Sequence, residues 1–207
     1  MDAIALLKQD HQTVEGLFKQ YEALGDRAVK QKKKIVAKII RELAIHSAIE
    51  EMFFYPAVRA AAAESETKSN DAADDLVLES LEEHHIVKWT LSELEKMSPE
   101  DERYDAKMQV LMESVRHHVE EEEQDLFPKA RRLLKNVIDE LGARMEKAKK
   151  LAPTHPHPRA PDQPPGNLLA GPMAAMADKG KDLLRELASK VSMRRGRAGK
   201  SIGELDS

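Results

Sequence analysis

The sequence predicts an all-α protein: an up-and-down four-helix bundle, then a proline-rich linker and a C-terminal amphipathic helix. Apolar residues recur at alternating steps of three and four through the first 150 residues, which is the period of a buried helix face. Charged residues make up 34% of the 207 residues and aromatic residues only 4%, which indicates a helical protein with a lean aliphatic core. Each predicted helix also carries one histidine in phase with its apolar positions.

Composition and charge exclude several classes of function. Because the chain has no cysteine, it contains no disulfide, thiolate metal site or cysteine nucleophile. Its formal net charge of −4 gives no general attraction to nucleic acid or to an anionic membrane. The N-terminus lacks the features of a signal peptide, and no apolar run is long enough to span a membrane. We therefore expect a cytoplasmic protein with no transmembrane segment and no nucleic-acid partner.

The first two helices are predicted to be antiparallel neighbours. Residues 4–21 carry apolar side chains at helical spacing, and His11 falls among them. Gly25 can end this helix and Asp26 can cap the next, which keeps the connection short. The second helix is expected over residues 29–63, with His46 and Glu50 at consecutive positions of its buried face.

The third helix is predicted to follow a loop over the polar residues 64–71. His84 is in phase with the apolar residues of this helix, whereas the positions in phase with His85 are polar. Helical geometry therefore selects His84 as the inward residue of the pair.

The fourth helix is expected to start at Ser98, because serine is a common N-cap and Pro99 suits the first helical position. Farther along, His118 and Glu122 are in phase with the apolar residues, whereas His117 is in phase with polar ones and should face water.

The character of the chain changes after Lys150, which predicts three segments: the bundle over residues 1–150, a linker over 151–172 and a tail over 173–207. The linker holds most of the prolines and should be extended. The tail has apolar residues at helical spacing and ends in basic residues, so it is expected to dock on a protein partner or an anionic membrane surface, or to fold back on the bundle.

Two stretches of the chain repeat one pattern, in which a histidine is followed four residues later by two glutamates and then by an aromatic residue and a proline. The repeats run from His46 to Pro56 and from His118 to Pro128. Residues four apart on a helix share a face, with about 5–6 Å between Cβ atoms, so each repeat can direct one imidazole and one carboxylate to a common point. The prolines predict local bends that close one end of this site.

Inward-facing histidines and glutamates in one bundle predict a metal site. Without a cation the buried carboxylates would repel each other or take up protons, and the imidazoles would compete for acceptors. Imidazole nitrogens and carboxylate oxygens are ligands that first-row transition metals accept, and carboxylates can bridge two metals about 3.5–4 Å apart. The predicted residues are His11, His46, Glu50, His84, His118 and Glu122.

The order of these residues along residues 1 to about 150 resembles the hemerythrin HHE cation-binding family. The resemblance implies a non-haem centre of two Fe ions, with the four histidines as nitrogen ligands and Glu50 and Glu122 as bridging carboxylates. Oxygen-carrying members use a fifth histidine one turn from His84, where this chain has Ser80 and Lys88, and they have an aspartate at the position of Glu122. One coordination position is therefore left to water or to another side chain, which disfavours simple reversible oxygen carriage.

Other features carry two interpretations each. Tyr55 is a packing residue, which its helical phase favours, or else the bend at Pro56 brings it to the site as a hydrogen-bond partner of the ligands or as a direct oxygen ligand. The acidic run 120–123 is expected to be a solvated face apart from Glu122. A ferritin-like di-iron site needs two Glu-x-x-His motifs, and only the one ending at His85 is present.

Three functions are compatible with these features. The first is a di-iron protein that binds dioxygen or reacts with peroxide, including catalase-like peroxide removal as the resemblance suggests. The second is a module that senses oxygen, nitric oxide or iron and signals through the C-terminal tail. The third is a metal-stabilised structural bundle or iron store.

Overall fold

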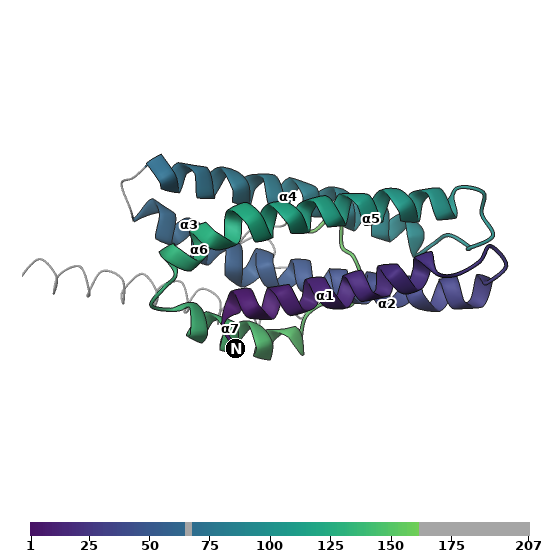
Figure 1. Ribbon diagram of the computed structural model, residues 1–207, viewed down its shortest axis with the longest axis horizontal. Coiled ribbons are helices and arrows are strands. Elements are labelled where there is room, and N and C mark those ends of the chain that lie inside the picture. Colours follow the sequence, from purple (N-terminus) through teal and green to yellow (C-terminus); the bar gives the residue numbers. More distant parts are fainter. Residues whose placement is uncertain (65–67, 162–207) are drawn as a thin grey trace, which may run out of the picture.

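The computed structural model describes residues 1–64 and 68–161 of the chain, and over those ranges it is all-helical. The elements are α1 (Ala3–Glu22), α2 (Val29–Ile49), the π-helical turn η1 (Glu50–Phe54), α3 (Tyr55–Ala63), α4 (Lys68–Leu94), α5 (Tyr104–Glu121), the π-helical turn η2 (Glu122–Leu126), α6 (Phe127–Leu133) and α7 (Ile138–Lys149). The helices α1, α2, α4 and α5 lie side by side along the long axis of the molecule (Figure 1). This arrangement is the predicted four-helix bundle, whereas the predicted tail over 173–207 lies outside the described residues.

Several predicted helix boundaries were wrong. The helix α1 ends at Glu22, and α2 begins at Val29 with no side-chain cap, so neither Gly25 nor Asp26 has the predicted capping role. Residues 23–28 instead form turns closed by backbone hydrogen bonds, such as Ala28 N–H to Gly25 O at 3.0 Å. The connection is nevertheless short, and the two helices are antiparallel neighbours (Figure 1).

The third helix begins earlier than predicted and the fourth begins later. The helix α4 begins at Lys68, inside the predicted loop, because a polar stretch is typical of helix N-termini as well as of loops. The helix α5 begins at Tyr104 rather than after Ser98. The Ser98 N–H donates to Asp101 Oδ2, and the Asp101 carbonyl accepts from Tyr104, so the capping contacts close a separate turn.

The prolines act where the sequence predicts local bends. Pro56 and Pro128 lie in the first turns of α3 and α6, directly after η1 and η2. A proline has no N–H to donate to the carbonyl four residues earlier, which disfavours a continuous α-helix. In both places the chain instead makes one wider turn, and π-helical turns of this kind are frequent at functional sites.

The apolar core is divided into two clusters by a polar level. Along α1, Ile4 and Leu7 belong to one cluster and Val14 belongs to the other, with His11 between them. Along α4, Leu81 and Val87 flank His84 in the same way. The polar level is therefore shielded on both sides by hydrophobic layers, which excludes bulk water from it.

The helix α7 was not predicted. After α6 the chain turns back and packs α7 against α1, α2 and η1, beside the N-terminus (Figure 1). Gly142 permits this approach, because a Cβ atom there would stand 2.6 Å from the backbone N of Ala3. Within the described ranges, no helix combines the length and the apolar character that crossing a membrane requires.

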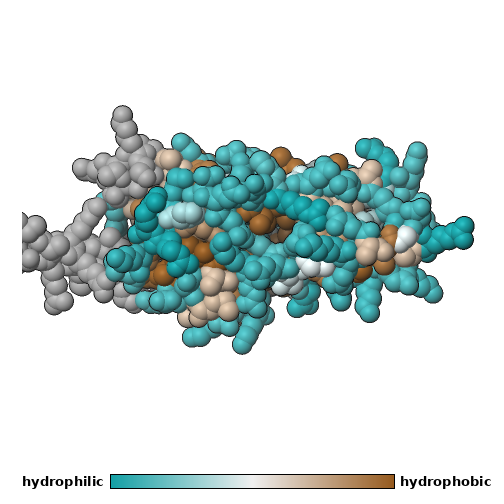
Figure 2. Space-filling view, in the orientation of Figure 1, coloured by the Kyte–Doolittle hydropathy of each residue, from teal (hydrophilic) through white to brown (hydrophobic). Residues whose placement is uncertain are grey.

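The described part of the predicted linker lies on the bundle. We call residues 152–161 the proline-rich strap; Ala152 and Pro156 in it are buried, and the Ala160 N–H donates to His157 O at 3.0 Å. The strap lines a groove together with residues of α2 and α4, so this part of the linker lies against the bundle, and the rest of the linker lies outside the described residues. The face of the molecule in Figure 2 is otherwise mostly hydrophilic, with apolar side chains visible only in small areas.

Candidate metal centre

All six predicted site residues meet at the polar level of the bundle. None is more than 6% exposed, and Glu50 and Glu122 are 0% and 1% exposed. The residues come from α1, α2, α4 and α5 and from the first positions of η1 and η2; they are His11, His46, Glu50, His84, His118 and Glu122. The neighbouring histidines His85 and His117 are exposed, in agreement with the choice made from helical phase.

The helical repeat explains how each histidine meets its glutamate. In the first repeat, His46 Nε2 lies 3.0 Å from Glu50 Oε2, and in the second, His118 Nε2 lies 3.6 Å from Glu122 Oε2. The histidine of α4 also reaches the first repeat: His84 Nε2 lies 3.4 Å from Glu50 Oε2. Each ring therefore directs its Nε2 atom to the centre of the bundle.

The cluster divides into two groups that could each hold a cation. Glu50 is a member of both groups. The potential ligand atoms within each group lie within 4.8 Å of one another; the first group is His11, His46, Glu50 and Glu122, and the second is Glu50, His84 and His118. Each group offers nitrogen and oxygen atoms that would suit one metal cation, and Glu50 is common to both.

The π-helical turns bring one aromatic residue to each group. Tyr55 N–H donates to Glu50 O, and Phe127 N–H donates to Glu122 O, so each aromatic residue follows its glutamate by five positions. The Tyr55 hydroxyl donates to Glu122 Oε1 at 3.0 Å and lies 3.3 Å from His84 Nε2. The Phe127 ring stacks on the ring of His11 with centroids 5.7 Å apart.

The favoured interpretation of Tyr55 as a packing residue covers only part of its role, because the side chain is buried in the apolar core and its hydroxyl also contacts the cluster. The wide turn rotates Tyr55 out of the phase that a regular α-helix would give it and directs its hydroxyl between the two groups, to Glu122 of the first and His84 of the second. Burial and the charges of Glu122 and Glu50 hold the pKa of the Tyr55 phenol well above its usual value. The side chain thus stays a neutral hydrogen-bond donor in this environment.

A carboxylate stands behind every histidine of the cluster, on the Nδ1 side of the ring. Three are at hydrogen-bonding distance from Nδ1: Glu123 Oε1 at 2.9 Å from His11, Glu51 Oε1 at 3.0 Å from His84 and Glu83 Oε2 at 2.7 Å from His118. The fourth, Asp10 Oδ2, is 3.6 Å from His46 Nδ1, close enough for an ion pair. Such partners fix a ring with Nδ1 protonated and leave Nε2 free to bind a metal.

These outer carboxylates were missed in the sequence, and Glu123 was wrongly assigned to a solvated face. Each lies next to a predicted ligand in the chain: Asp10 before His11, Glu83 before His84, Glu51 after Glu50 and Glu123 after Glu122. The sequence signal was thus a repeated acidic neighbour. Its meaning depends on contacts between different helices, which helical phase alone does not give.

The atoms at the centre of the cluster lack hydrogen-bond partners. Both carboxylate oxygens of Glu50, one of Glu122 and the Nε2 atoms of His11 and His46 are buried without one. Unpartnered buried polar atoms are costly and rare. Their lone pairs point to a shared centre, and a nitrogen and oxygen donor set of this kind suits a first-row transition metal. The residues therefore fit the cation that the cluster implies.

The charges of the cluster support the same conclusion. Burial disfavours a charged imidazole, but Glu50 and the other nearby carboxylates outweigh that effect and raise the pKa of His46 to about 10 and that of His84 to about 9. Burial likewise disfavours the charged form of Glu50, yet the nearby His46 lowers the pKa of Glu50 well below its usual value. The carboxylates of the site are thus stabilised by nearby positive charge, which either protons on the histidines or metal cations can supply.

The ferritin-like alternative finds no support in the structure. Glu82 and His85, which form the Glu-x-x-His motif, are both exposed. Ser80 and Lys88, which stand where a fifth histidine would be, make other contacts: the Ser80 hydroxyl donates to Leu76 O, and Lys88 Nζ donates to both oxygens of Glu51.

A helical bundle with buried histidines and glutamates at its centre defines a class of cation-binding proteins, and comparison with known proteins gives the family. The Hemerythrin HHE cation binding domain matches residues 2–130. An uncharacterised hemerythrin-like protein of Schizosaccharomyces pombe is 31% identical over 153 residues, which are 72% of this chain and 70% of that protein. The chain belongs to the hemerythrin HHE cation-binding family.

A solved structure supports the fold. The crystal structure of a hemerythrin HHE cation-binding domain-containing protein from Mycobacterium kansasii superposes with a TM-score of 0.60 at 23% sequence identity. The match covers 72% of this chain and 86% of that one. The HHE bundle is thus shared at low sequence identity.

Proposed function

We propose that this chain binds two iron ions and that the loaded centre binds dioxygen or reacts with peroxide. His11, His46, Glu50 and Glu122 would hold one ion, and His84 and His118 would hold the other with Glu50. Iron bound in this way supplies a redox couple between the ferrous and ferric states. The observation that carries the proposal is the set of buried, unpartnered nitrogen and oxygen atoms that share one centre.

A small cavity beside the histidines supports a diatomic or similarly small substrate. Its volume is about 20 Å³, and its apolar lining includes Val14, Leu43, Val87 and Val115. A water molecule needs roughly 10–15 Å³, so the space suits a molecule of the size of dioxygen or peroxide. The four histidines of the cluster form the polar part of its wall.

A second cavity, of about 230 Å³, lies between α1 and α5 and shares His11, Val14, Val115 and Val119 with the first. We propose that small molecules reach the centre from this side. Glu123 and Arg116 stand at the wall of this second cavity. The residues of this face would therefore admit a small molecule while the valines limit the entry of larger ones.

Anaerobic reconstitution with ferrous iron tests the proposal. We expect two irons per chain by metal analysis, and a new visible absorption when dioxygen or hydrogen peroxide is added. A matched variant, Val115→Phe, keeps every ligand but fills the small cavity, so it should keep two irons and react more slowly. Iron loading without any spectral response to dioxygen or peroxide in the unaltered chain would contradict the redox function and leave a structural metal site.

Sensing through the C-terminal segment is a second candidate, and the position of the strap favours it. The strap lines the same groove as Glu51, the carboxylate that accepts from His84. A chain ending at Lys150 loses the strap, whereas a chain ending at Pro161 keeps it. Sensing predicts that binding of a partner requires both iron and the residues after 150, whereas peroxide turnover requires iron but not the residues after 150. The docking of the tail and the cytoplasmic location stay predictions.

A further inference from the structure

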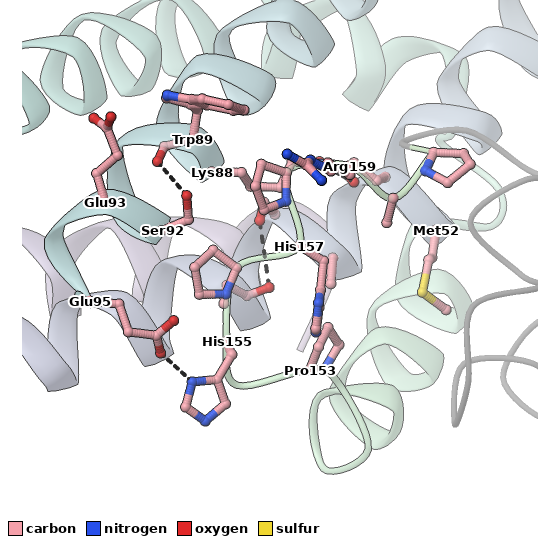
Figure 3. Close-up of a pocket in the computed structure, with 18 of the residues that line it drawn as sticks. Met52, Lys88, Trp89, Ser92, Glu93, Glu95, Pro153, His155, His157 and Arg159 are labelled. Atoms are coloured by element: carbon pink, nitrogen blue, oxygen red, sulfur yellow. Dashed lines mark hydrogen bonds and ion pairs between the residues drawn. The ribbon is translucent and has the colours of Figure 1, made fainter.

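A groove separate from the oxygen-sized cavity lies beneath the proline-rich strap. The groove has a volume of about 860 Å³ and lies between α2, α4 and the strap. Cavities of roughly 300–1,000 Å³ are typical of small-molecule sites. Figure 3 shows Trp89, Lys88 and Arg159 toward one end of the groove and Glu95 with His155 toward the other.

The apolar surfaces of the groove suit a flat ring. Ala44 and Ala48, one turn apart on α2, form part of its lining together with Met52. Prolines of the strap and the indole of Trp89, which is 48% exposed, line it as well. Aromatic rings pack well against indole and against the sulfur of a methionine.

The charges of the groove favour an anion. Each of its three carboxylates already has a cationic or imidazole partner: Glu51 binds Lys88, Glu93 binds Lys107 and Glu95 binds His155. By contrast, Lys96 and Arg159 line the groove and form no ion pair within residues 1–64 and 68–161. Within the described residues these two cations are therefore available to a ligand, and the guanidinium of Arg159 can bind a carboxylate through two parallel hydrogen bonds.

The inner wall of the groove reaches the metal centre. Lys88 Nζ lies 2.8 and 2.9 Å from the two oxygens of Glu51, and both side chains are at least 90% buried. Glu51 Oε1 in turn lies 3.0 Å from His84 Nδ1. An anion near Lys88 would compete with Glu51 for its protons and so change the hydrogen bond that Glu51 makes to His84.

We propose that this groove binds a small aromatic carboxylate and that its occupancy alters the metal centre through Lys88, Glu51 and His84. The second half of this statement rests on the proposed function, whereas the first half does not. The ring lies among Trp89, Met52 and the prolines, and the carboxylate faces Arg159, toward the end of the groove where Lys88 lies.

The indole of Trp89 gives a direct test, because it is the single tryptophan of the chain. Its N–H gives one cross-peak in a nitrogen–proton correlation spectrum of the full-length, metal-free protein. We expect saturable shifts of this peak with 2-naphthoate and weaker binding, by about 10-fold or more, with the neutral 2-naphthamide. Calorimetry measures the same two affinities independently.

Matched variants separate the groove from general charge effects. Arg159→Gln should weaken binding of 2-naphthoate by about 10-fold. Arg41→Gln, an equal change of charge at an exposed position of α2 that does not line the groove, should leave it unchanged. No shift of the indole peak with 2-naphthoate, or equal loss in both variants, would overturn the groove as an anion site.

The link to the metal is read on iron-loaded protein. Saturating 2-naphthoate should change the visible absorption of the ferric centre in the unaltered chain and much less in Lys88→Met. An indole shift without any change of the ferric spectrum would overturn the coupling and keep the binding site. Failure of the chain to load iron would overturn the proposed function while leaving the indole titration decisive for the groove.

Discussion

The two halves of the bundle, residues 1–63 and 68–133, place equivalent side chains around the centre but differ in what surrounds them. The equivalent pairs are His11 and His84, His46 and His118, Glu50 and Glu122, Asp10 and Glu83, Glu51 and Glu123, and Tyr55 and Phe127. In each half, the acidic residue before the first histidine faces the second histidine of the same half. The acidic residue after the glutamate faces the first histidine of the other half.

The differences between the halves make the two groups of candidate ligands inequivalent. The hydroxyl of Tyr55 lies between the groups and contacts Glu122 and His84, whereas the ring of Phe127, which has no hydroxyl, stacks on His11 of the first group. Lys149 of α7 pairs with Asp10, while Glu51 is held by the buried Lys88. The repeat therefore sets the ligands, and the residues and helices around them decide how each position behaves.

Among the variants that test this comparison, removal of the shared carboxylate should reduce metal binding the most. Glu50→Gln changes a residue of both groups, so we expect loss of both metal ions, by more than the roughly 10- to 100-fold in affinity that an outer partner contributes. Glu122→Gln should mainly affect the first group. Metal content per chain under competition with a chelator measures both, and the exposed Glu120→Gln is the control. Two tightly bound ions in Glu50→Gln would refute the shared position.

The outer carboxylates should have the next largest effect, and they test the halves separately. Asp10→Asn should weaken the position that contains His46, and Glu83→Gln the position that contains His118, each by about 10- to 100-fold in metal affinity. Chelator titrations that resolve two steps would show one step shifted in each variant. Equal shifts of both steps in both variants would mean that the two positions are not independent.

An exchange of the aromatic residues sharpens the comparison further. Tyr55→Phe removes one hydroxyl that contacts Glu122 and His84, and we expect a loss of about 10-fold in metal affinity, as for an outer hydrogen-bond partner. The double variant Tyr55→Phe with Phe127→Tyr moves the hydroxyl away from Glu122 and His84 to the ring that stacks on His11. The visible spectrum of the ferric protein should change in the single variant and differ again in the double one. Identical spectra in all three proteins would show that the hydroxyl has no influence on the centre.

A change in the packing of α7 against the first half should have the smallest effect on metal binding. Gly142→Ala places a Cβ against the backbone of Ala3, and overpacking of this kind costs about 1–3 kcal/mol in the free energy of unfolding. Denaturant unfolding measures this loss, with Gly16→Ala, which has no atom within 4 Å of the added Cβ, as the control. Because no ligand changes, both metal ions should still bind. A Gly142→Ala protein as stable as the unaltered chain would show that α7 is loosely attached.

The sequence by itself determined the bundle and the six central residues. His84 and His118 could be chosen over His85 and His117 because a helix fixes which side chains share a face with its apolar residues. The positions of Pro56 and Pro128 marked the bends, because a missing N–H acts on the local backbone alone. These features follow from neighbours in the chain.

Only the tertiary structure decided the rest. The hydrogen bonds of Glu51, Glu83 and Glu123 to histidines of other helices, and the return of α7 onto α1, depend on how separate segments pack. The π-helical turn that directs Tyr55 inward changes the helical phase from which its packing role was predicted. Local periodicity carries no information about contacts between distant segments, and it fails where the helical period itself changes.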